Sequence, residues 1–275
     1  MSLESQVASL VSAANKLTSE IAGKMKGIDQ KVDAATASVP NSIKQESYKD
    51  FYIDAVNGND SNSGSISSPL KTIREASDRS LNISVVNVRL MGGQSFEAEF
   101  ASSCTRVRFY TYNSSQGIAK IYPKAHRRDD GTYYLRALAS NGSFQTVVFH
   151  GVHVICGVFP EEALPAEYHI DQFSSNFIFG DQGRDIYLYN CILDIDEISF
   201  TGIHAGYASR NLSIGSTQIN RINGSSLKLV NSRTSSNPIL TIAVSSAVLS
   251  GWSNWIELLP VNGNEQNILS NISLS

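Results

Sequence analysis

Three acidic residues that lie close together in the sequence are the first candidates for chemistry. Asp194 and Asp196 are two positions apart in a segment that reads as a β-strand, and Glu197 follows them directly. Side chains two positions apart in a strand point to the same face, so we expect the two aspartates to lie side by side. Two carboxyl groups on one exposed face can act as acid and base in glycan cleavage. Such residues are more often the solvated side of a strand, so these three are candidates and the catalytic residues stay unknown.

A second acidic group lies in residues 157–183, a stretch that interrupts the strand pattern with two prolines. It contains His169 and the acidic residues Glu161, Glu162, Glu167 and Asp171. We interpret it as a long loop that leaves a rigid scaffold, which is where binding residues are often found. The charged run from Arg127 to Asp130 precedes an expected strand over 132–138, and we interpret it as a structural turn.

The histidines do not predict a metal site. His150 and His153 are three positions apart in a strand, so they are expected to face opposite sides, and no third ligand is near in sequence. His150 aligns with Asn190 of a later, similar segment, which suggests a role in a hydrogen-bonded bend. Tyrosines are numerous enough to contact sugars, but the sequence selects none of them: Tyr110, Tyr112, Tyr133, Tyr134, Tyr187, Tyr189 and Tyr207.

Composition limits the classes of function. The chain has 275 residues, a net charge of −3, a pI near 6.0 and only 17% charged residues. No basic patch is present, so nucleic-acid binding is not expected. Three cysteines without CxxC spacing predict neither a disulfide framework nor a zinc site and fit a reducing cytoplasm: Cys104, Cys156 and Cys191. We expect no signal peptide, no membrane insertion, no metal and no cofactor, because none of the corresponding motifs occurs.

The N-terminal segment, residues 3–38, predicts one long helix with a narrow apolar stripe. The apolar positions alternate spacings of four and three, which is the heptad pattern of a coiled coil. A four-residue insertion near Lys24 shifts the stripe by one position without ending it. We expect this stripe to join several chains rather than to lie on its own domain, and the expected trimerisation residues are Leu3, Val7, Leu10, Ala14, Leu17, Ile21, Met25, Ile28 and Val32. The helix is expected to end at Val39–Ser42, around Pro40.

Residues 51–76 organise the rest of the chain. A short strand over 51–56 leads into a run, residues 57–69, that consists almost wholly of Asn, Gly, Asp and Ser and predicts turns. After Pro69, the spacing of Leu70, Ile73 and Ala76 predicts a short helix. The run also imitates the first half of a calcium-binding loop, but Leu70 stands where a bidentate glutamate is required, so we interpret it as structural.

The string DAVNGNDSNSGS, followed by SSP and KTI, resembles the segment that caps the first coil in the right-handed parallel β-helix proteins of the pectate-lyase-like superfamily. Members of that superfamily with an N-terminal helical stalk are typically bacteriophage tail spikes and tail fibres. The resemblance implies a mainly β fold, a right-handed parallel β-helix (solenoid) preceded by an α-helical coiled-coil stalk. It divides the chain into a stalk and virion-attachment segment (1–43), a linker and capping segment (44–80) and a β-helix body (81–275).

The segments behind the cap support this interpretation without fixing a period. Apolar and polar residues alternate in 84–91 and 105–112, and paired short strands are expected in 146–156, 185–195, 210–220, 226–234 and 268–274. An antiparallel β-sandwich would have a similar density of turns. The capping segment, not periodicity, favours the solenoid.

The resemblance implies a virion structural protein, a homotrimeric tail fibre or tail-spike-like appendage for host-surface attachment. The alternative is a polysaccharide depolymerase, a glycoside hydrolase or lyase acting on host capsule or O-antigen. A host-encoded adhesin is a third reading, which the missing signal peptide disfavours. The short β body favours the structural role over the enzyme.

The stalk and the β body are expected to have different partners. Residues 1–43 contain no aromatic residue, so we expect them to bind other phage tail or baseplate proteins while the β body faces a host-surface glycan. The expected location is the virion tail, after synthesis in the bacterial host cytoplasm.

Overall fold

The protein folds into two units, residues 1–47 and 48–275. The structure is a computed structural model, and it describes residues 2–81, 83–101, 104–139, 145–160, 164–165, 167–172, 174–179, 184–203, 209–232, 239–260 and 268–275, with no side-chain description for 37–46, 139 and 203. The first unit is a helix and the second is mainly β, with parallel sheets. In the described part of the chain, no helix combines the length and apolar character needed to cross a membrane.

Helix α1 (Leu3–Ser47) is 45 residues long and confirms the predicted long N-terminal helix. The large apolar residues of the predicted stripe are all exposed, from 49% at Ile21 to 76% at Leu3. An apolar stripe this narrow and this exposed is typical of a helix that packs against other chains.

The helix extends further than the sequence predicts. The predicted stop at Val39–Ser42 is wrong, because α1 continues through Pro40 to Ser47. A proline inside a helix removes one backbone donor and costs about 3 kcal/mol. Residues Lys44–Glu46, which follow the proline, are good helix formers, so the helix continues past this single proline. The boundary between the two units therefore falls after residue 47 rather than after residue 43.

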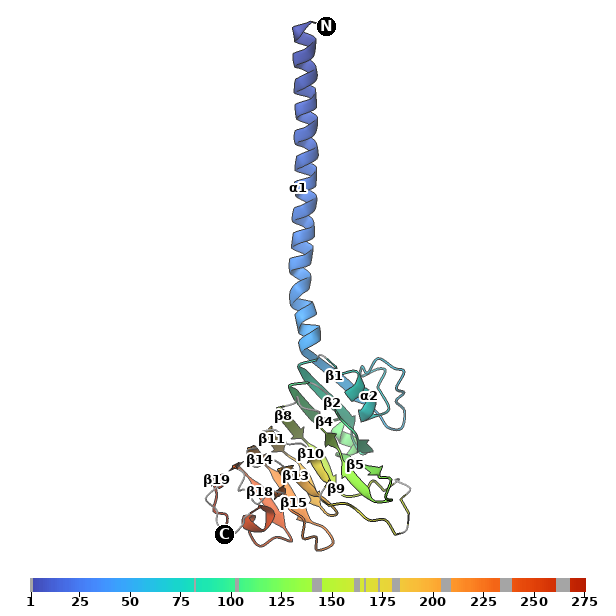
Figure 1. The fold of residues 1–275 in the computed structure, drawn as a ribbon, viewed down its shortest axis with the longest axis vertical. Coiled ribbons are helices and arrows are strands. Elements are labelled where there is room, and N and C mark those ends of the chain that lie inside the picture. Colours follow the sequence, from blue (N-terminus) through green and yellow to red (C-terminus); the bar gives the residue numbers. More distant parts are fainter. Residues whose placement is uncertain are drawn as a thin grey trace. The chain divides into compact units, whose positions relative to one another are not determined.

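Three sheets build the second unit, and Figure 1 shows β2, β4, β8, β11 and β14 of the first sheet following one another. The first sheet has eight parallel strands, in the order β1 (Tyr48–Ile53), β2 (Val85–Met91), β4 (Arg106–Tyr112), β8 (Thr146–His150), β11 (Arg184–Tyr189), β14 (Arg210–Gly215), β17 (Leu240–Val244) and β19 (Ile268–Ser270). The second contains β18 (Ala247–Ser250), β15 (Thr217–Arg221), β12 (Ile192–Ile195), β9 (Val152–Cys156), β5 (Ala119–Arg127) and β3 (Ser95–Ala98), with β6 (Tyr133–Arg136) antiparallel to β5. The third contains β16 (Val230–Ser232), β13 (Ser199–Ile203), β10 (Asn176–Phe179) and β7 (Leu138–Ala139).

From β8 onward the chain visits the three sheets in a fixed order. Strands β8, β9 and β10 lie in the first, second and third sheets, and β11 to β13 and β14 to β16 repeat this order. The paired residues are unevenly spaced along the chain: Val85 pairs with Arg106, which in turn pairs with Thr146, and the second of these steps is much longer than the first. This variation explains why no period is visible in the sequence.

A left-handed residue makes the bend between the first and second sheets. Gly151, Asn190 and Ser216 have φ values of 62°, 53° and 49°. They follow β8, β11 and β14, and the amide of Gly151 donates to the carbonyl of Tyr189 at 2.9 Å, which links neighbouring bends. His150 pairs with Tyr189 on the strand itself. The predicted alignment of His150 with Asn190 is therefore wrong by one residue.

The capping segment is held by its own acidic side chains. Asp54 is buried and accepts hydrogen bonds from the amides of Val56 (3.0 Å) and Asn57 (2.9 Å) and from Gln94 Nε2 (2.9 Å). Asp60 accepts from the amides of Lys71 (2.8 Å) and Thr72 (2.9 Å). These carboxylates are engaged by the chain itself, which supports the structural interpretation of the loop.

The short helix begins later than expected. Helix α2 (Ile73–Asp78) is capped by Thr72, whose hydroxyl accepts from the amide of Glu75 at 3.2 Å. Leu70 precedes the helix and bridges to Ile53 like a strand residue, with both side chains fully buried. The predicted helical position of Leu70 is therefore wrong, although its burial agrees with the apolar pattern.

A column of phenylalanines fills the interior between the sheets. Phe109 and Phe149 are stacked with ring centroids 5.3 Å apart, and Phe149 contacts Phe177 and Phe200 edge-on at 6.0 Å. All four are fully buried. Because each ring comes from a different strand, the column connects successive turns of the chain.

Residues 157–183 are not wholly a loop. They contain β10, a strand of the third sheet whose register pairs Ile178 with Leu138 and with Thr201. This stretch is thus an enlarged connection between β9 and the third sheet, which it joins through β10. Glu161 and Glu162 lie outside the described residues.

Candidate functional site

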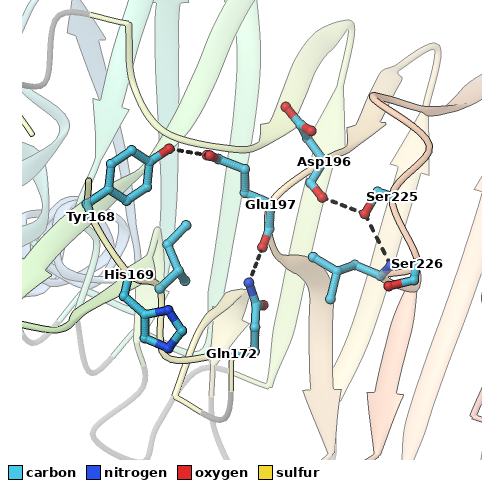
Figure 2. A pocket seen from close by; sticks show the side chains of 9 residues that line it. Tyr168, His169, Gln172, Asp196, Glu197, Ser225 and Ser226 are labelled. Carbon is cyan, nitrogen blue, oxygen red and sulfur yellow. Dashed lines mark hydrogen bonds between the residues drawn. The ribbon is translucent and has the colours of Figure 1, made fainter. Parts of the chain in front are cut away.

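A polar hollow of the second unit lies where residues 168–172 meet the turn after β12. It has a volume of about 530 Å³, and Tyr168, His169, Ile170 and Gln172 line it on one side. Asp196 and Glu197, from the turn between β12 and β13, form its back, and a loop before β16 closes it with Ser225, Ser226 and Leu227. Figure 2 shows these side chains around the opening.

Backbone pairing forces the turn that presents the two carboxyl groups. After Ile195, the amides of Glu197 and Ile198 both donate to the carbonyl of Cys156, at 2.9 and 3.0 Å. The hydroxyl of Ser225 donates to the carbonyl of Asp196 at 2.5 Å. The backbone of the turn is thereby held between the end of β9 and the loop that contains Ser225.

Glu197 is held on both carboxylate oxygens. Its Oε2 accepts from the amide of Val158 at 2.7 Å, and its Oε1 accepts from the hydroxyl of Tyr168. Gln172 Nε2 donates to the backbone carbonyl of the same residue at 2.6 Å (Figure 2). The hydrogen bond to Glu197 raises the pKa of Tyr168 to about 12, since ionising the phenol would place two negative charges together. Both oxygens of the Glu197 side chain are therefore occupied by donors of the chain itself.

Asp196 is the carboxyl group best suited to carry a proton. Burial raises its pKa, and the negative charges of Glu197 and Asp194 raise it further, against one hydrogen bond from Asn223 Nδ2 at 3.0 Å. Asp196 Oδ2 and Glu197 Oε2 lie 3.4 and 3.6 Å from the point beside Gly157 where a Cβ would stand, so the two carboxyl groups are neighbours. A like-charged pair of this kind favours protonation of one member.

Asp194 has a different role. Its Oδ2 lies 2.7 Å from His153 Nε2, and its Oδ1 accepts from Asn220 Nδ2 at 2.7 Å. Burial alone would raise its pKa, but the hydrogen bonds from His153 and Asn220 outweigh burial, so the pKa lies below its usual range. Asp194 is thus an ionised partner of His153 on the outer face of the second sheet.

The structure places the three acidic candidates on two elements: Asp194 on β12, and Asp196 and Glu197 in the turn that follows it. The predicted strand position of Asp196 is wrong, because β12 ends at Ile195 and Asp196 already lies in the turn. Asp194 nevertheless lies near enough for its charge to raise the pKa of Asp196. The two residues that share the cleft are Asp196 and Glu197. A raised pKa beside a fixed carboxylate is the arrangement with which glycan-cleaving enzymes separate a proton donor from a negative charge.

The other predicted groups divide between the cleft and the scaffold. His169 lines the cleft, whereas Asp171 forms an ion pair with Arg128 at 2.6 Å. Asp130 accepts from the amide and hydroxyl of Thr132, at 2.9 and 2.6 Å, which confirms that the run before β6 is a structural turn. Sequence reasoning missed Tyr168 and Ser225, because isolated tyrosines and serines carry no signal until the fold brings them to Glu197 and Asp196. Within the described residues, no group of three or more His, Cys, Asp or Glu side chains could hold a metal ion.

Asp194→Asn and Asp196→Asn are expected to change stability in opposite directions. Asp194, whose pKa is lowered in the folded protein, stabilises it above its unfolded pKa, and this contribution is lost as the pH falls through the folded value. Its replacement should cost about 1.5–3 kcal/mol at pH 7, the range for hydrogen bonds to a charged group. Asp196, whose pKa is raised, weakens the fold as the pH rises through its folded value, so Asp196→Asn should gain about 0.5–1 kcal/mol at pH 7.

Urea unfolding between pH 3 and pH 8, followed by tryptophan fluorescence, measures both differences. Each should shrink toward acid pH, where both aspartates are protonated in the wild-type chain. Equal destabilisation by the two variants would contradict the assigned roles.

Comparison with known proteins leaves the family open. Neither a protein-family model nor a curated protein matches the chain. Among solved structures, the chain is similar to the GH136 lacto-N-biosidase from Eubacterium ramulus, with 16% identity and a TM-score of 0.44, over 73% of this chain and 41% of that one. The chain spans less than half the length of that protein, and a likeness this weak carries no argument about fold or activity.

Proposed function

We propose that the protein is a homotrimeric, tail-spike-like appendage of a bacteriophage virion that attaches to the host surface. In this proposal three copies of α1 form a coiled-coil stalk, and the second unit is a right-handed parallel β-helix that faces the host. The single observation that carries the proposal is the heptad stripe of α1, whose large apolar residues are at least 49% exposed.

The order of the sheets and a general rule of handedness support the right-handed β-helix. The repeated visit to three parallel sheets in a fixed order is what a solenoid of three-sided coils requires. Crossovers between parallel strands are right-handed in about 98% of cases, which favours that hand here. The resemblance of the capping segment to phage β-helix proteins then gives the virion tail as location and other tail or baseplate proteins as partners of the stalk.

A second candidate function is depolymerisation of host capsule or O-antigen. The observation that favours it is the raised pKa of Asp196 beside Glu197 in an open cleft. The two asparagine variants described above discriminate the functions in a reducing-end assay on host polysaccharide. Release of reducing ends that Asp196→Asn abolishes would favour the enzyme, and intact polysaccharide would favour attachment alone.

Deletion of residues 2–47 tests which end is anchored. The second unit has its own core, so the shortened chain should stay folded, while incorporation into particles should fall to background. Immunoblots of purified particles, with circular dichroism of the shortened protein, measure the two results. Normal incorporation of the shortened chain, or binding of residues 1–47 alone to host cells, would reverse the proposed polarity.

A further inference from the structure

A second hollow lies on the outer face of the first sheet and contains no residue of the acidic cleft. Its volume is about 470 Å³, within the range of small-ligand sites, and it crosses strands β4, β8 and β11. It is lined by Arg106, Arg108, Thr146, Val148, Tyr187 and Tyr189, with Tyr110 and His150 at one end. We call this hollow the trough.

The trough exists because short side chains lie between long ones. On β8 the outward residues are Thr146 and Val148, and they pair with Arg106 and Arg108 of β4. On the other side Val148 pairs with Tyr187 of β11. Since neighbouring strands are about 4.8 Å apart, the two short residues form a floor, with Arg106 and Arg108 on one side and Asp185 and Tyr187 on the other.

An aligned row of rings closes one end of the trough. Tyr110, His150 and Tyr189 occupy paired positions on neighbouring strands, and the rings of Tyr110 and His150 are 5.8 Å apart. The next position in this row is Gly215, where a Cβ would stand 2.8 Å from the Tyr189 ring. The ring of Tyr189 therefore rests over the glycine and, stacked 6.1 Å from Tyr187, has a fixed position.

The two arginines of the trough are available to bind a ligand. In the part of the chain that the structure describes, neither Arg106 nor Arg108 has a side-chain hydrogen bond or an ion pair. Among the described residues, neither acidic group on the same face forms an ion pair with these arginines: Asp50 pairs with Arg89 at 3.1 Å. Asp185, which is paired with Thr146, accepts a hydrogen bond from the side-chain amide of Asn211 at 2.7 Å. Two guanidinium groups beside an apolar floor favour an anion with an apolar face.

We propose that the trough binds an acidic oligosaccharide, with a sugar carboxylate on Arg106 and Arg108. Guanidinium groups bind carboxylates through paired hydrogen bonds, and the sugar C–H face can pack on Val148 and Tyr187. This proposal rests on the proposed attachment function and deepens it, because it names an acidic glycan and a face of the molecule distinct from the cleft.

Binding to defined oligosaccharides tests the proposal with the full-length protein. The probes are oligomers of galacturonic acid, of sialic acid and of hyaluronan, with neutral maltohexaose as control, measured by titration calorimetry in low and high salt. The wild-type chain should bind at least one acidic probe and not the neutral one, and binding should weaken with salt. Arg106→Gln with Arg108→Gln should weaken it at least tenfold, and Tyr187→Ala should also weaken it.

Arg127→Gln with Lys71→Gln is the matched control. It removes two exposed positive charges outside the trough and should leave binding unchanged.

Equal loss in the control and trough variants, equal binding of neutral and acidic probes, or no binding of any acidic probe would overturn the proposal. A change of particle mass in the trough variants would overturn it in favour of an interface between copies of the chain. If the trough variant still attaches to host cells like the wild type, the trough assignment fails and the attachment function stands. If the wild-type chain attaches to no cells, the attachment function fails.

Discussion

A chain carrying Leu10→Asp and Leu17→Asp is expected to be monomeric and to attach to host cells at least 100-fold more weakly than the wild type. Both leucines lie on the stripe of α1 and are 72% and 58% exposed in the single chain. In a trimer each substitution would bury three carboxylates in one layer of the coiled coil, which is strongly unfavourable. Loss of the trimer removes multivalent contact, which typically strengthens attachment by about 10²–10⁴-fold.

Ser9→Asp with Ser12→Asp is the matched control for the stripe variant. It adds the same two charges on the same helix at positions outside the stripe, so the trimer and its attachment should be retained. Sedimentation velocity and cell-binding assays on both variants measure the difference. A monomeric control, or a trimeric stripe variant, would show that this stripe is not the interface.

Phe149→Ala is expected to lower the free energy of unfolding of the second unit by about 3–5 kcal/mol, the usual cost of removing a buried phenylalanine. The Phe149 ring is fully buried and contacts Phe109, Phe177 and Phe200. Because these rings come from different strands, the cavity would weaken contacts between successive turns of the chain as well as within one.

Val148→Ala is the control for the core variant, because Val148 directly precedes Phe149 in β8 and faces outward. Its loss should cost less than about 1 kcal/mol. The chain has two tryptophans, Trp252 and Trp255, both in the second unit, so denaturant unfolding followed by tryptophan fluorescence reports on that unit. Similar losses for Phe149→Ala and Val148→Ala would contradict the inward and outward assignment of β8.

The sequence predicts the local elements of this fold well. The alternation in 84–91 and 105–112 agrees with β2 and β4, and the double segments at 146–156, 185–195 and 210–220 agree with three strand pairs. These elements are predictable because burial on one face leaves a period-two pattern. The pairs expected in 226–234 and 268–274 are wrong for the described residues, which form one strand in each, β16 and β19. The number of sheets was not predictable, since stretches of very different length separate the strands that pair, and their pairing depends on contacts across the whole unit.

The sequence predictions for Leu70 and His150 are wrong because strand pairing, rather than local residue spacing, decides their positions. Leu70 has helical spacing, but its amide donates to the carbonyl of Tyr52 at 2.9 Å, so it joins a strand instead. His150 was assigned to a bend by a one-residue error of register, and such an error moves a side chain from one face to another. On its correct strand position, His150 contributes to the trough, which the sequence alone did not reveal.

The residues of the acidic cleft were also only partly predictable from the sequence. The sequence identified Asp196 and Glu197 together with Asp194, but it placed Asp196 on the strand, which ends at Ile195. It therefore did not reveal that Asp196 and Glu197 line the cleft while Asp194 contacts His153. The partner that holds Glu197, Tyr168, comes from 29 residues earlier, and only the fold brings the two together. The sequence found the residue types, while the structure decides which of them share a site.

The mass of the unmodified chain in solution tests the account most directly. A chain weighs 29.9 kDa. Sedimentation equilibrium at micromolar concentration should give a particle of three chains, because the exposed stripe of α1 is then buried between copies. A mass of one chain over the same range would remove the coiled-coil stalk and the appendage proposal with it, and a mass of two chains would contradict the trimer.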